Sequence, residues 1–162
     1  MIRATRFRQA AMAFAVLAAA ACTPATEAPT VTVYRSAQCG CCGKWAAQLR
    51  AAGLRVVEVY RDDLAAVKDR LGVPGGVRSC HTAVLDGHVI EGHVPIELVL
   101  ALARDGAPYL GLAVPGMPRG SPGMEHPEPV RYTVYAFAQD GRVRVHSEHQ
   151  GRSAAERGEA ER

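Results

Sequence analysis

The chain has 162 residues, of which 48% are hydrophobic, and this length suits one domain with a substantial core but hardly two. It carries 19 lysines and arginines against 16 aspartates and glutamates, but three of the arginines and none of the acids lie in residues 1–21. Taking those three away leaves 16 basic and 16 acidic side chains, so the rest of the chain has no net charge and no basic stripe, which argues against a nucleic-acid partner.

The amino-terminal segment, residues 1–21, has the pattern of a secretory signal peptide. Arg3, Arg6 and Arg8 precede an apolar run over residues 10–21, which is too short to span a bilayer comfortably. Cys22 follows three alanines, as in an imperfect lipobox, and is the candidate lipidation site. We therefore expect a protein of the bacterial periplasm, either soluble or held at the membrane only by a lipid anchor on Cys22.

The next segments alternate between strand and helix patterns. Residues 22–30 have linker composition, and residues 31–34 predict a strand. A cysteine-rich loop leads into a helix from about Gly43 to Ala52, and residues 54–60 predict a second strand. Asp62 is placed to cap a second helix, in which Leu64, Val67, Lys68 and Leu71 recur at helical spacing.

A hairpin and a third helix complete this pattern. Residues 82–85 and 88–90 flank Asp86-Gly87, a strong hairpin signal, and Pro95 suits the first turn of a helix. The resulting order, β-α-β-α-β-β-α, predicts an α/β protein with a thioredoxin-like fold and a cysteine-rich loop at a helix amino terminus. Its predicted extent is residues 31–125.

The remaining segments predict a loop, a hairpin and a tail. Residues 106–125 are rich in glycine and proline, and we expect no regular structure there. Two alternating stretches, residues 131–138 and 142–146, surround Asp140-Gly141 and predict a carboxy-terminal β-hairpin extension, assigned to residues 126–149. Residues 150–162 have the composition of a disordered tail.

The cysteine-rich loop is the strongest chemical signal. Cys39, Cys41 and Cys42 place three thiols within four residues, between a strand and a helix. A helix amino terminus favours the thiolate, which serves equally as a nucleophile and as a metal ligand. A redox dithiol needs only two sulfurs, whereas converging sulfurs suit a soft ion such as Cu(I). Cys39, Cys41 and Cys42 are therefore candidate metal ligands.

A fourth thiol, Cys80, gains meaning from the predicted topology. In thioredoxin-like folds the segment before the third strand packs against the cysteine loop and carries a proline, and here His81 stands in that place. We expect Cys80, and with it His81, beside Cys39 and Cys42. The fourth sulfur would complete a set of thiolate ligands and block the backbone pairing that thioredoxins use for disulfide substrates.

Further candidate donors, acting as ligands or as contacts to ligands, lie elsewhere. Met117 and Met124 belong to the glycine- and proline-rich loop, and their thioethers prefer Cu(I). His88 and His93 are five residues apart, so an ideal strand would point them to opposite faces. A structural role is the expectation for both, with His93 kept as an additional candidate.

Two other functions fit the same residues. Cys39 and Cys42 are the redox candidates for a thiol-disulfide oxidoreductase, with Cys41 as a resolving thiol. Four cysteines also suit a structural zinc module, although zinc ligands usually come from two spaced pairs. Structural disulfides alone are disfavoured, because adjacent Cys41 and Cys42 do not pair easily.

From about residue 31 to residue 125 the chain resembles the CopG-like family, exported bacterial proteins once catalogued as a domain of unknown function and associated with copper resistance. Position 88 departs from the resemblance, because relatives often have an aromatic residue where this chain has His88. The matching motifs are Cys39-Gly40-Cys41-Cys42-Gly43-Lys44-Trp45, Ser79-Cys80-His81-Thr82-Ala83-Val84, Glu91-Gly92-His93-Val94-Pro95 and the glycine- and proline-rich run over residues 111–124.

The resemblance implies a thioredoxin-like fold with copper on Cys39, Cys41, Cys42 and Cys80. It also implies interconversion of Cu(I) and Cu(II), which leaves open whether the protein is a copper oxidoreductase. The leading hypothesis is a periplasmic copper-binding protein that holds one or several Cu(I) ions in a thiolate cluster. Its expected partners are copper ions and other periplasmic copper-handling or efflux proteins.

Overall fold

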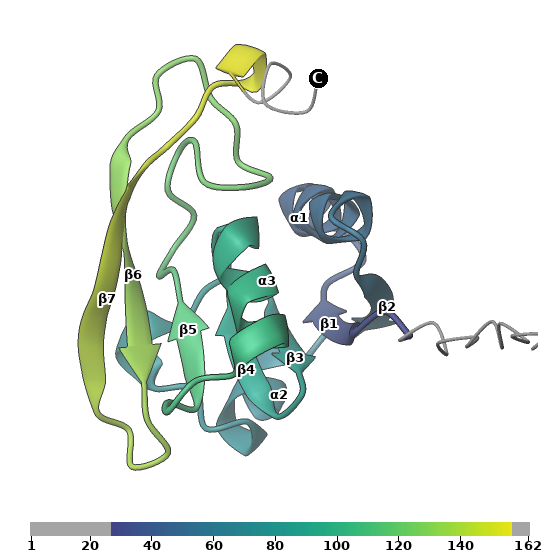
Figure 1. Ribbon diagram of the computed structural model, residues 1–162, viewed down its shortest axis with the longest axis vertical. Coiled ribbons are helices and arrows are strands. Elements are labelled where there is room, and N and C mark those ends of the chain that lie inside the picture. Colours follow the sequence, from purple (N-terminus) through teal and green to yellow (C-terminus); the bar gives the residue numbers. More distant parts are fainter. Residues whose placement is uncertain (1–26, 157–162) are drawn as a thin grey trace, which may run out of the picture.

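The computed structural model describes residues 27–156, which form one seven-stranded mixed sheet with helices on both faces (Figure 1). The predicted signal peptide, residues 1–21, and Cys22 lie outside the described residues. Within residues 27–156 no helix is both long and apolar enough to cross a bilayer. The elements are β1 (Thr30–Arg35), α1 (Gly40–Ala51), β2 (Arg55–Tyr60), α2 (Leu64–Arg70), the 3₁₀ helix η1 (Gly75–Val77), β3 (Thr82–Leu85), β4 (His88–Glu91), α3 (Ile96–Asp105), β5 (Gly111–Ala113), β6 (Arg131–Phe137) and β7 (Val143–Gln150).

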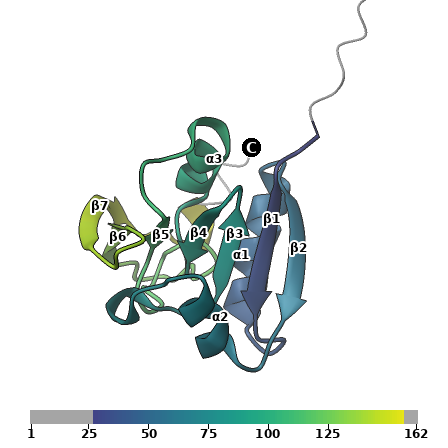
Figure 2. The ribbon, with the colours of Figure 1, turned by 90° about the horizontal axis from the view of Figure 1, so that it is seen from below.

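The strands lie in the order β2-β1-β3-β4-β5-β6-β7 (Figure 2). β1 and β2 are parallel and joined through α1, whereas β1 and β3 are antiparallel. β3 and β4 form the hairpin predicted at Asp86-Gly87. Both turn residues have positive φ, 47° and 83°, as a two-residue hairpin loop requires.

The two faces of the sheet carry different helices. Neighbouring residues of a strand point to opposite faces, and Ile90 and Val89 accordingly belong to separate hydrophobic clusters. The cluster of Ile90 contains Trp45 of α1 and Val99 of α3, so these helices cover one face. The cluster of Val89 contains apolar residues from the end of α2 to η1, on the other face.

The expectation of no regular structure in residues 106–125 is wrong at one point. Gly111–Ala113 forms β5, which is parallel to β4 and antiparallel to β6. A Cβ at Gly111 would collide with the Val89 carbonyl and the Phe137 ring, so only glycine fits there. A strand of three residues is too short to leave a periodic signal, yet it joins β6 and β7 to the rest of the sheet.

Some predicted boundaries also move. Asp63, whose side chain accepts from the Ala66 N–H, caps α2 in place of the expected Asp62. α1 begins at Gly40, after Cys39 in the N-cap position, rather than near Gly43, because its two glycines obscure the helical pattern. The first residues of the expected disordered tail are part of the structure, because Gln150 is the last residue of β7. The Gly151 N–H donates to the Val130 carbonyl, and the Arg152 N–H donates to the Gly120 carbonyl. The last part of the predicted tail, residues 157–162, lies outside the described residues.

Candidate metal centre

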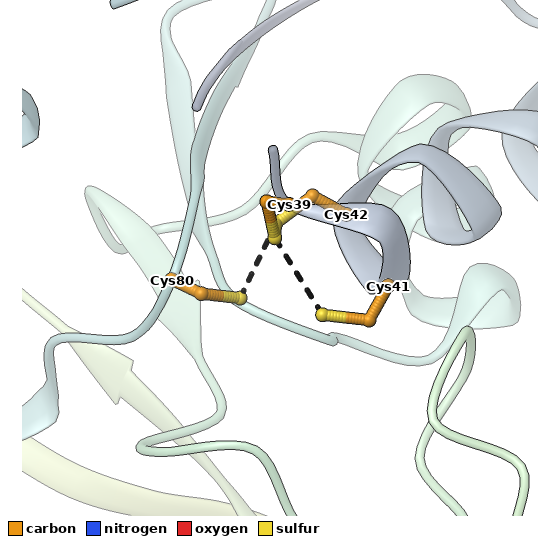
Figure 3. A group of neighbouring side chains, drawn as sticks. All are labelled: Cys39, Cys41, Cys42 and Cys80. Atoms are coloured by element: carbon orange, nitrogen blue, oxygen red, sulfur yellow. Dashed lines mark hydrogen bonds between the residues drawn. A yellow bond between two sulfur atoms is a disulfide. The ribbon is translucent and has the colours of Figure 1, made fainter. Parts of the chain in front are cut away.

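Four cysteine sulfurs converge at the amino-terminal end of α1 (Figure 3). Cys39 and Cys42 form a disulfide, and within residues 27–156 Cys41 and Cys80 are the free thiols. The Cys41 sulfur lies 3.5 Å from that of Cys39, and the Cys80 sulfur lies 3.5 Å from that of Cys42. All four sulfur atoms lie within 4.8 Å of one another. The structure thus brings together the four cysteines that the sequence singled out.

The pairing of β1 with β3 explains why Cys80 reaches the loop. Tyr34, next to the end of β1, lies opposite Thr82, the first residue of β3. Because the strands are antiparallel, the residues just before β3 face the loop that follows β1. Cys80 lies two residues before Thr82, and Cys39 lies in that loop.

Two buried histidines, His81 and His93, also contact the Cys80 sulfur. His93 Nε2 lies 3.1 Å from it and His81 Nδ1 lies 3.3 Å from it. His93 Nδ1 lies 2.8 Å from the Pro122 carbonyl oxygen, to which it donates, so the lone pair of Nε2 faces Cys80. His81 Nε2 is buried and has no hydrogen-bond partner. Cys80, His81 and His93 thus form a second group of converging donors that shares Cys80 with the first.

His93 does not occupy the regular strand geometry that the sequence analysis assumed for it. β4 ends at Glu91, and Gly92, with a φ of 71°, turns the chain before His93. His93 therefore does not continue the alternation of the strand and points to Cys80. His88 stays in the strand, where Nδ1 lies 3.1 Å from the Tyr109 carbonyl oxygen. The glycine before His93 was the signal available in the sequence.

The electrostatics of this region favour uncharged groups in the absence of metal. Burial, together with the nearby Cys41, raises the pKa of Cys80 to about 12. Burial lowers the pKa of His81 well below its ordinary value of 6.5, and the charges of His93, Lys68 and Arg35 lower it further. Burial also lowers the pKa of His93. Near neutral pH Cys80 is therefore a thiol beside two neutral imidazoles, and a bound cation would favour its thiolate.

A buried carboxylate holds the segment that carries Cys80. Glu91 Oε1 accepts hydrogen bonds from the Ser79 N–H and from Lys68 Nζ, both at 2.6 Å. Glu91 Oε2 accepts a third from Thr82 Oγ1 at 2.7 Å. Ser79 and Thr82 flank Cys80 and His81, so one side chain fixes both ends of this short segment. The sequence reasoning missed Glu91, although a lysine on the inward face of a helix was a signal for a buried partner.

Arg35, the last residue of β1, forms hydrogen bonds to the backbone of the cysteine loop. It continues the inward alternation of Val31 and Val33 along β1, and it is 8% exposed. Its guanidinium donates to the carbonyl oxygens of Ser36, at 3.0 Å, and Cys39, at 3.3 Å. The same guanidinium forms an ion pair with Glu58, so Arg35 holds the cysteine loop through hydrogen bonds to its backbone, a feature that sequence reasoning also missed.

The loop that carries Met117 and Met124 packs against both sides of the site. The Ser79 hydroxyl donates to the Gly116 carbonyl. A Cβ at Gly123 would lie 2.7 Å from the Cys41 carbonyl oxygen, so the loop also touches the start of α1. Met117 is 53% exposed and Met124 is half-buried. The structure brings their loop to the cysteines and leaves the Met117 side chain largely in solvent.

Comparisons with known proteins agree with these features. The profile of a protein family of unknown function, DUF411, matches residues 77–124, which include Cys80 and His93. Two solved structures of the copper resistance protein CopG are each 45% identical in sequence. Form 1 matches over 77% of this chain and 100% of its own, with a TM-score of 0.72. Form 2 matches over 76% and 99%, with a TM-score of 0.71. No curated protein shows significant similarity to the chain. At this identity and coverage the chain belongs to the CopG-like family.

Proposed function

We propose that this chain is an exported copper-binding protein that contributes to copper resistance by holding Cu(I) on Cys39, Cys41, Cys42 and Cys80. The observation that carries the proposal is the convergence of four sulfur atoms within 4.8 Å at one helix end. Thiolate sulfur is a soft donor, and Cu(I) is a soft ion that prefers such donors. Sulfurs this close can also bridge ions, which suits a cluster of several Cu(I).

The surrounding groups fit copper as well. His93 has the arrangement of a metal-binding histidine. Its Nδ1 donates a hydrogen bond to the Pro122 carbonyl, and its Nε2 faces the Cys80 sulfur. The buried, unpartnered Nε2 of His81 shows that this imidazole is not satisfied by the protein alone. We assign His81 and His93 as additional ligands or as contacts to Cys80. Met117 and Met124 are assigned the same role from their loop.

The proposed domain organisation follows the topology. Parallel β1 and β2, antiparallel β3 and β4, and a helix that begins at the cysteines support a thioredoxin-like domain over residues 31–125. Residues 126–149, which contain most of β6 and β7, would be a carboxy-terminal hairpin extension of that domain.

The basic and apolar character of residues 1–21 supports a signal peptide and a periplasmic site of action. The partners would be copper ions and the copper-handling or efflux proteins of that compartment.

The disulfide between Cys39 and Cys42 supports a redox role for the same residues. In the reduced protein these two thiols can give one electron to each of two Cu(II) ions. The products are two Cu(I) ions, the disulfide and two protons, so electrons and charge balance. The remaining thiols of Cys41 and Cys80 lie beside the disulfide to receive Cu(I). An external dithiol would have to reduce the disulfide before another cycle.

The test is an anaerobic Cu(I) titration of the reduced protein against a competing chelator, with metal analysis of the complex. The expected result is at least one tightly held Cu(I) per chain in the wild type, and loss of most of the affinity in Cys80→Ser. His126→Ala, a change in the loop before β6, is the control and should bind as the wild type does. Unchanged stoichiometry in both Cys39→Ser and Cys80→Ser would refute the assignment.

The second candidate is a thiol-disulfide oxidoreductase. One observation favours it, the disulfide between Cys39 and Cys42. It predicts catalysed reduction of insulin that survives in Cys80→Ser and is lost in Cys39→Ser. Weak copper binding together with such activity would select it. A zinc module is the third candidate, and a strong preference for Zn(II) over Cu(I) in the same competition experiment would select that.

A further inference from the structure

β7 carries an irregularity that changes the direction of one histidine. Val134 pairs with Ser147 and Tyr135 pairs with Val145, so His146 is an extra residue with no partner on β6. This is a β-bulge, which re-aims the side chain of the strand that contains it. In a regular strand His146 and Ser147 would point to opposite faces. Here the bulge brings the two side chains into contact.

As a result two imidazoles converge on one hydroxyl group. His146 Nδ1 lies 2.9 Å from Ser147 Oγ, and His149 Nε2 lies 2.8 Å from the same oxygen. A hydroxyl group can donate to one of these nitrogens and accept from the other. Two ring nitrogens and an oxygen from one strand thereby meet around a single point at the protein surface.

The outer nitrogen of each ring lies near a polar group, at ion-pair distance for His149 and at the limit of hydrogen bonding for His146. His149 Nδ1 lies 3.9 Å from Glu97 Oε1, on α3. His146 Nε2 lies 3.5 Å from the Tyr109 hydroxyl. Aromatic rings add to this, because His149 stacks on Tyr132 and His146 meets the Tyr109 ring edge-on. Metal-binding histidines typically have such a partner on the nitrogen that does not bind the ion.

His146 is exposed, and Ser147 and His149 are half-buried, so a solvated ion can reach this point. His149 lines an open cleft of about 900 Å³ between β7 and the start of α3, together with Glu97 and Glu148. Glu156 and Arg152 also line this cleft, so its three carboxylates outnumber its one arginine and favour a cation near His149. The closest fixed positive charge on β7, Arg144, lies over the Tyr109 ring at 6.0 Å from its centre.

We propose that His146 Nδ1 and His149 Nε2, with Ser147 Oγ between them, form a surface site for a divalent ion that prefers imidazole, Cu(II) above all. The site is separate from the cysteine centre in both residues and chemistry. Imidazole nitrogens and a hydroxyl group select Cu(II), which stands highest among divalent first-row ions for such donors, whereas the cysteines select Cu(I). It would hold the oxidised ion at the surface without involving a thiol.

The test titrates Cu(II) into the purified chain in its disulfide state, after Cys41 and Cys80 have been blocked with a small methylthiolating reagent. Electron paramagnetic resonance counts the bound Cu(II), and electron spin echo modulation reports coordinated imidazole. The expected result is one Cu(II) with two imidazole ligands. His146→Ala and His149→Ala should each weaken it by about tenfold or more, and Glu97→Gln by up to about tenfold. His126→Ala is the matched control and should leave the binding unchanged.

Circular dichroism of each variant verifies that these surface changes leave the fold intact. A Cu(II) signal that is equal in the wild type and in the double variant His146→Ala/His149→Ala would overturn the proposal. The proposal would also be overturned if the wild-type Cu(II) had only one imidazole ligand and the same signal persisted in His146→Ala or in His149→Ala. Blocking the thiols separates this result from the cysteine centre, so the surface site stands or falls independently of the proposed Cu(I) function.

Discussion

His93 Nε2 lies 3.1 Å from the Cys80 sulfur, and the Pro122 carbonyl holds the ring in that orientation by accepting from Nδ1. The contact joins three distant segments, the one before β3, the one after β4 and the loop near residue 122. It makes His93 the histidine whose free lone pair is best placed at the cysteine centre.

Replacing His93 by glutamine should weaken Cu(I) binding by about 10- to 100-fold, the usual effect of losing a ligand-orienting or ligand group. The competition titration described above measures it. His88→Gln is the matched control, because His88 faces the Tyr109 carbonyl and not the cysteines. Equal affinity in both variants would show that His93 plays no part in holding copper.

The Lys68–Glu91 pair predicts a large change in stability. Glu91 is fully buried and Lys68 is 5% exposed, so Glu91→Gln leaves a buried ammonium group without its counter-charge. We expect the free energy of unfolding in urea to fall by about 3–5 kcal/mol. Asp69→Asn, which breaks the exposed pair with Arg78, should cost no more than about 1 kcal/mol.

The same variant tests the positioning of Cys80. Glu91 holds the Ser79 N–H and the Thr82 hydroxyl, so its loss should loosen the segment between them. The Cys80 thiol should then react faster with a thiol reagent under native conditions. A Glu91→Gln protein with wild-type stability and wild-type Cys80 reactivity would contradict the role assigned to this carboxylate.

The close approach of Gly123 to α1 predicts a specific effect on the site. Alanine at Gly123 would have an unfavourable positive φ of 83° and a Cβ 2.7 Å from the Cys41 carbonyl oxygen. Gly141→Ala shares the positive φ, 81°, but has no atom within 4 Å of the added Cβ. Both variants should lose about 1–2 kcal/mol from the backbone alone. Only Gly123→Ala should also lose Cu(I) affinity, because the loop with Met124 must move away from Cys41.

The two site histidines predict how the metal-free protein responds to acid. Their pKa values are lowered on folding, so below pH 6.5 the unfolded chain binds more protons than the folded one. The stabilisation that the two neutral histidines contribute is therefore fully present above pH 6.5. It is lost as the pH falls from 6.5 through their lowered pKa values. The slope should reach about 1.4 kcal/mol per pH unit for each histidine.

Urea unfolding between pH 7 and pH 5 measures this slope. The comparison with His81→Gln/His93→Gln cancels the carboxyl groups that both chains share, so the double variant should have the shallower dependence. An identical slope in the two proteins would mean that neither histidine is held in its neutral form by the fold.

The sequence by itself determined the local features of this protein. Three cysteines within four residues, the Asp86-Gly87 turn and Pro95 at the start of α3 each depend on neighbouring residues only. They were sufficient for most elements and, through the thioredoxin-like topology that they predicted, for the approach of Cys80 to the loop. The resemblance to the CopG-like family also rested on short local motifs, such as Cys39-Gly40-Cys41-Cys42 and Ser79-Cys80-His81-Thr82.

Only the tertiary structure decided which polar groups meet across those elements. Glu91 reaches Lys68, 23 residues away in the chain, and His93 reaches Pro122, 29 residues away. Such contacts leave no periodicity, because each depends on strand order and on the point at which a strand ends. β5 needs Gly111 to fit against Val89 and Phe137, and the convergence of His146 and His149 needs a bulge in β7. Long-range packing, which no local window contains, set all four.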